Sequence, residues 1–63
     1  MMARMLRINE MDQPVVPTCE LDSYEPANEF LRGLIEEAKE NGEATQNDAD
    51  GCPVTATVWD AEA

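Results

Sequence analysis

The stretch that decides the fold is residues 26–42, which reads PANEFLRGLIEEAKENG. Its apolar residues recur at the three- and four-residue spacing that aligns them in one stripe along an α-helix. They are Ala27, Phe30, Leu31, Leu34, Ile35 and Ala38. Asp22 and Ser23 are good N-cap residues, and Pro26 suits the first helical turn. Because Gly42 suits the position after a last turn, the sequence predicts one amphipathic helix ending there.

The sequence before the helix predicts two extended segments. Residues 3–11 alternate in polarity as a strand does, with Leu6 and Ile8 on one face. Residues 12–14 have the composition of a turn. The next segment, residues 15–21, is expected at a sheet edge or as plain extended chain. The prolines in and before it cannot donate a backbone hydrogen bond to a neighbouring strand.

The sequence after the helix predicts a strand over residues 53–60, which are rich in β-branched side chains. Alternation divides this strand into one face with Val54, Ala56 and Val58 and another with Thr55, Thr57 and Trp59. Part of the polar segment 43–51 is a candidate for a short hairpin arm. The expected fold is therefore α+β, in the order β-β-α-β or with one further strand. A small antiparallel sheet would carry the helix on one face, and residues 1–63 would form a single domain.

Composition excludes several classes of function. The chain has 63 residues, with 14 Asp and Glu against 4 Lys and Arg, no His, and a formal net charge of -10. Direct binding to nucleic acid or to an anionic membrane is not expected, because both need clustered cations. Without His, imidazole cannot serve as a general base or metal ligand. A hydrophobic share of 43% nevertheless favours a folded domain over disorder.

The cysteines and the loop before the last strand carry no clear catalytic pattern. Cys19 and Cys52 form no CxxC pair, and a cysteine nucleophile would lack a His base. The segment around Asp48, Asp50 and Gly51 resembles half of a calcium loop but lacks the acid at its twelfth position. We therefore expect no enzymatic activity, catalytic residue, metal or cofactor. With no signal-like or membrane-spanning segment, we expect a cytoplasmic protein with reduced cysteines, although a disulfide or a reactive thiol remains an alternative.

The polar side of the predicted helix is rich in glutamate. At 100° per residue, Glu25, Glu29, Glu36 and Glu40 fall within a sector of about 60° opposite the apolar stripe, and Glu37 lies beside it. Like charges four residues apart cost an isolated helix about 0.2–0.5 kcal/mol per pair. Beyond the helix, Glu43, Asp48 and Asp50 extend the negative charge. Our hypothesis is that these eight carboxylates bind a basic surface on a partner protein.

Three other interpretations compete with that hypothesis. The acidic face could simply be solvated, or the acidity could reflect adaptation to high salt. In a third, the protein is a small homodimeric structural or assembly protein whose acidity serves solubility. Trp59, with Thr55 and Thr57, would then form the dimer or contact surface. Alternatively, Trp59 packs under residues 43–51.

The overall profile resembles the small acidic phage-encoded inhibitors, which include anti-CRISPR and DNA-mimic proteins. The resemblance depends on chain length, net charge and Glu25, Glu29, Glu36, Glu37 and Glu40, and on no defined motif. It implies a non-enzymatic inhibitor that occupies the basic nucleic-acid channel of a host complex, in the host cytoplasm. An antitoxin-like neutraliser of a basic toxin would use the same physical interaction with a different partner.

Overall fold

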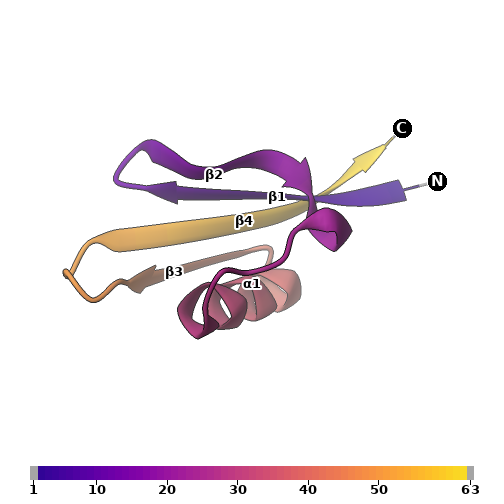
Figure 1. Ribbon diagram of the computed structural model, residues 1–63. Helices are drawn as coiled ribbons and strands as arrows, with labels where there is room; N and C mark the ends of the chain where they lie inside the picture. Colours follow the sequence, from indigo (N-terminus) through magenta and orange to yellow (C-terminus); the bar gives the residue numbers. More distant parts are fainter. Residues whose placement is uncertain (1, 63) are drawn as a thin grey trace.

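The computed structural model describes residues 2–62 and has the predicted α+β architecture (Figure 1). Its elements follow in the order β1 (Met2–Glu10), β2 (Gln13–Glu20), a 3-10 turn η1 (Leu21–Ser23), α1 (Glu29–Asn41), β3 (Glu43–Asn47) and β4 (Pro53–Glu62). The strands form one antiparallel sheet, and α1 packs against one face of it.

The sheet has the strand order β2-β1-β4-β3. Its centre is the long β1–β4 ladder, in which Met2 pairs with Glu62 and Glu10 pairs with Val54. The second extended segment is the edge strand β2, as its prolines predict, and its pairing with β1 contains register shifts. At the opposite edge, β3 pairs with β4, so the polar segment after the helix does supply the further strand.

The core lies between the sheet and α1. The face of β4 that alternation predicts to be apolar is buried at Val54, Ala56 and Val58. The other buried residues are Leu6, Ile8, Leu21, Leu34, Ile35, Ala38 and Ala44. Full burial of one large aliphatic side chain contributes about 1.5–3 kcal/mol, so this small set must supply most of the folding free energy.

The helix begins later than the sequence predicts. Asn28 is its N-cap, because the Asn28 side chain accepts a hydrogen bond of 2.9 Å from the backbone N–H of Leu31. Asp22 and Ser23 belong instead to η1, where burial of Leu21 draws the chain against the core. Ala27, Glu25 and Pro26 therefore lie in the connection before α1 rather than on the helix.

The end of the helix is confirmed. Gly42 adopts a left-handed conformation with φ of 86°, and its N–H donates to the carbonyl of Ala38 at 2.7 Å. Lys39 lies in the last turn, where the helix dipole favours a cation.

The first hairpin turns one residue earlier than predicted. Glu10 pairs with Gln13, so Met11 and Asp12 alone form the loop, with φ values of 48° and 70°. Two successive positive φ values are the pattern of a type I′ turn, which suits the twist of a hairpin but is usually made by Asn and Gly. Met11 at this tip is 64% exposed.

Candidate functional site

The structure places an exposed row of glutamates on α1. Glu29, Glu36 and Glu40 are all exposed, and the helical period puts them within about 40° of one another. Glu37 is also exposed and lies to the β3 side, where its carboxylate accepts a hydrogen bond of 3.5 Å from Gln46. These four residues are called the acidic row below.

Neutralisation of the acidic row within the described residues is limited. Lys39 donates to Glu36 at 3.3 Å across an ion pair whose side chains are 33% and 65% exposed. Exposed pairs of this kind contribute about 0.2–1 kcal/mol, so the row remains predominantly negative. Arg32 and Lys39 line a hollow of ≈ 190 Å³ between α1 and η1 together with Glu36, so both cations of α1 border the acidic row.

The other predicted carboxylates are dispersed. Glu25 is exposed in the connection before α1, so its predicted place on the helix is wrong. Glu43 begins β3 beside the buried Ala44, and strand alternation therefore turns Glu43 to the face away from α1. Asp48 and Asp50 lie in the loop between β3 and β4.

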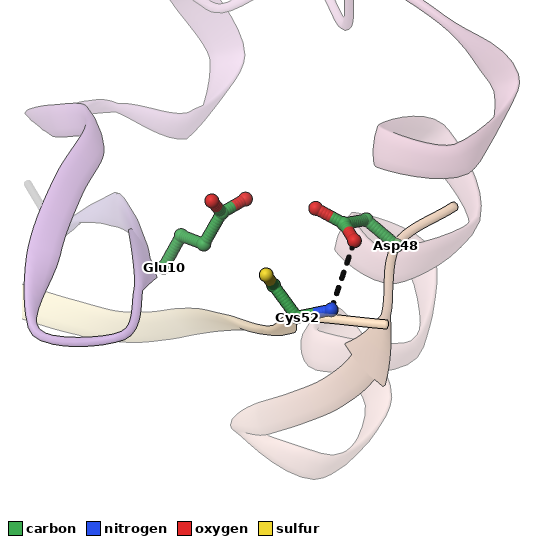
Figure 2. A group of neighbouring side chains, drawn as sticks. All are labelled: Glu10, Asp48 and Cys52. Carbon is green, nitrogen blue, oxygen red and sulfur yellow. Dashed lines mark hydrogen bonds between the residues drawn. The ribbon is translucent and has the colours of Figure 1, made fainter. Parts of the chain in front are cut away.

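A second group of polar side chains gathers at that loop. Glu10 at the end of β1, Asp48 and Cys52 each offer a ligand atom, and these atoms lie within 4.8 Å of one another (Figure 2). Each of the three residues is half-buried. The sequence gives no signal for Glu10 here, because only the β1–β4 register brings it to the loop.

Backbone donors fix Asp48 in this cluster. One carboxylate oxygen of Asp48 accepts hydrogen bonds from the backbone N–H of Asp50 at 2.9 Å and of Cys52 at 3.0 Å. The Asp48 N–H in turn donates to the Cys52 carbonyl at 2.9 Å, and Gly51 takes a left-handed φ of 82° that closes the loop. The aspartate thus holds its own loop in shape, as Asx turns do.

The cluster shifts the pKa of all three groups. The hydrogen bond from the Cys52 backbone lowers the pKa of Asp48, whereas a hydrogen bond with Asp48 is the main cause that raises the pKa of Glu10. Desolvation, followed by the charge of Asp48, raises the pKa of the Cys52 thiol. A raised pKa keeps the thiol protonated and disfavours a nucleophilic role. Two carboxylates and a sulfur could also share one divalent cation.

The sheet face opposite α1 has a different character, with hydroxyl and aromatic side chains. Thr45 and Thr55 hydrogen-bond through their hydroxyls at 2.9 Å. The guanidinium carbon of Arg7 lies 5.8 Å from the centroid of the Trp59 ring, within cation–π range. Trp59 is half-buried and lies beyond the last β3–β4 pair, Glu43 with Thr57, so it packs beside Arg7 and not beneath residues 43–51.

Comparisons with known proteins add no identity. No protein-family model, curated protein or solved structure matches this chain. Within residues 2–62, α1 is too short and too polar to be a membrane-spanning helix.

Proposed function

We propose that the protein is a non-enzymatic inhibitor that binds a basic, nucleic-acid-binding surface of a partner protein through the acidic row of α1. The observation that carries the proposal is the alignment of exposed glutamates along one side of a helix whose other side is buried in the core. Binding would therefore leave the core undisturbed, since the only contacts given up within residues 2–62 would be the exposed Lys39–Glu36 ion pair and the Gln46–Glu37 hydrogen bond.

The spacing of the row suits a surface that normally binds nucleic acid. One helical turn rises about 5.4 Å, so Glu36 and Glu40 present negative charges at a spacing comparable to that of phosphates along a strand. A basic groove attracts such a row at long range, and encounter is accelerated by complementary potentials. An inhibitor of this kind competes with nucleic acid by occupying its groove.

The distribution of charge favours a directed surface over a uniform salt-adapted one. The acidic row lies on the helix side of the sheet, whereas the opposite face carries Arg7 and Glu43 among several threonines. Salt adaptation would spread carboxylates over the exposed surface irrespective of face. The asymmetry therefore supports a role for the helix side in recognition.

The test is competition against short duplex DNA for binding to a purified nucleic-acid-binding complex, such as a CRISPR effector. The variant is Glu29→Gln/Glu36→Gln/Glu40→Gln. The matched control, Asp12→Asn/Glu20→Gln/Asp60→Asn, removes the same charge from exposed positions off the helix. Circular dichroism confirms that each variant is folded.

We expect the wild type to displace DNA and the control to do so equally well. The helix variant should be weaker by about threefold to a hundredfold, from the loss of three exposed pairs at about 0.2–1 kcal/mol each. Direct binding of the protein to the complex, measured without DNA, should weaken between about 50 and about 200 mM salt. If the helix variant displaces DNA as well as the wild type, the acidic row is not the binding surface. A basic toxin in place of the complex tests the antitoxin-like interpretation with the same variants.

A further inference from the structure

We infer that the sheet face opposite α1 is an interface for a second copy of this chain, in which Arg7 of each copy pairs with Glu43 of the other. The proposed inhibitor would then be a dimer that presents two acidic rows on its outer sides. The inference concerns a different face from the proposed function and does not depend on it.

The face carries a cation, Arg7, and an anion, Glu43, at matched positions, and a second anion, Asp12, lies at the hairpin end of the same hollow. Arg7 pairs with Thr57 in the β1–β4 ladder, and Glu43 pairs with Thr57 in the β3–β4 ladder. All three residues line a hollow of ≈ 350 Å³ on this face. Arg7 and Glu43 thus lie on one rung of the sheet, separated by β4 and by about 10 Å. Among the described residues, Arg7 forms no salt bridge, and Lys39–Glu36 is the pair that is formed.

This arrangement is self-complementary under twofold symmetry. Consider two sheets stacked face to face about 10 Å apart, with a twofold axis midway between them and parallel to β4. This axis places β1 of one copy opposite β3 of the other, and residues on one rung stay at the same height along the strands. Arg7 of one copy then faces Glu43 of the other, and the pair occurs twice. The residues Thr55, Thr57 and Trp59 of β4 meet their own counterparts along the axis.

The remaining charge pattern favours this face over the helix side for self-association. With a net charge of -10, two copies repel each other wherever carboxylates meet. The acidic row lies on the opposite side of the sheet, and the rung of Arg7, Thr57 and Glu43 carries no net charge. Trp59 adds a half-buried aromatic ring, the residue type enriched at protein interfaces.

The test is analytical ultracentrifugation of the full chain under reducing conditions, at concentrations from about 10 µM to about 1 mM. We expect reversible dimerisation. It should tighten as salt rises, because screening of repulsion between two chains of net charge -10 outweighs weakening of two ion pairs. That sign is opposite to the one expected for binding a basic partner. Trp59 is the only tryptophan, so dimerisation should also shift its fluorescence to shorter wavelength.

Charge reversal identifies the surface. Arg7→Glu should weaken dimerisation by about tenfold or more, because two attractive pairs become repulsive. Adding Glu43→Arg restores the wild-type net charge and should return affinity to within about twofold of the wild type. The control Arg32→Glu makes the same reversal on α1 and should leave dimerisation within about twofold of the wild type.

Two results would overturn the inference. One is a monomer at every concentration and salt. The other is a dimer that Arg7→Glu does not weaken, or that Arg7→Glu/Glu43→Arg does not restore. Thermal melts must show that both variants are folded.

Discussion

Replacement of Gly33 by alanine should stabilise the protein. Gly33 lies in the middle of α1, and a Cβ atom added there meets nothing within 4 Å. Glycine in a helix interior costs about 0.8–1.0 kcal/mol relative to alanine, because it loses more backbone entropy on folding. The structure offers no close approach to offset that cost, so Gly33→Ala should recover most of it.

The expected gain in stability is large relative to the total free energy of unfolding. A domain of this size has a folding free energy on the order of 3–9 kcal/mol. One kcal/mol shifts the melting temperature of a small domain by about 4–8 °C, so the variant should melt about 4–8 °C higher by circular dichroism. Urea unfolding should show a higher midpoint with an unchanged slope, since the buried area does not change.

Gly42→Ala is the matched control, because its φ of 86° strains any L side chain although its space is equally open. It should destabilise the protein by about 1 kcal/mol. A lower melting temperature for Gly33→Ala would refute the reasoning, because it would mean that the folded chain requires the absence of a Cβ atom at position 33.

Three further changes test other parts of the structure. In the folded protein, Asp48 raises the pKa of Glu10 above its ordinary value of 4.5. Protonated Glu10 therefore stabilises the fold below pH 4.5, and this stabilisation is lost as the pH rises through the folded pKa. Glu10→Gln keeps a neutral partner for Asp48, so thermal melts should show it to be more stable than the wild type at pH 7, with no difference in acid. Asn28→Ala removes the side chain that caps α1 by accepting from the Leu31 N–H. It should lower the free energy of unfolding, measured in urea, by about 1 kcal/mol, whereas Asn28→Asp should not. Asp12→Gly relieves a φ of 70° and should stabilise the hairpin by up to about 1 kcal/mol in urea unfolding; a loss would argue against the type I′ turn.

Local pattern predicted most of the fold. The 3.6-residue stripe located the helix, and two-residue alternation assigned Val54, Ala56 and Val58 to the core. The helix start was wrong because two capping signals lie close together. Asn28 is the cap, whereas the segment with Asp22 and Ser23 turns to bury Leu21. That choice depends on tertiary packing, which no local propensity reports.

The candidate surfaces were only partly predictable, for a related reason. Periodicity alone aligned Glu29, Glu36 and Glu40, and they do share one side of α1. Strand pairing decided the rest. It turned Glu43 to the far face, and it brought Glu10 to Asp48 from nearly forty positions away, a juxtaposition that depends on register. That the acidic row binds a basic partner stays a prediction.

The central ladder also has a consequence for biosynthesis. Because β1 pairs along its whole length with β4, β1 finds its main neighbour only after β4 has left the ribosomal exit tunnel. Closure of so large a loop carries an entropic cost before any pairing rewards it, and topologies of this kind fold slowly for their size. The central ladder should therefore form only once β4 has emerged, and truncation before β4 should leave fragments that cellular proteases degrade.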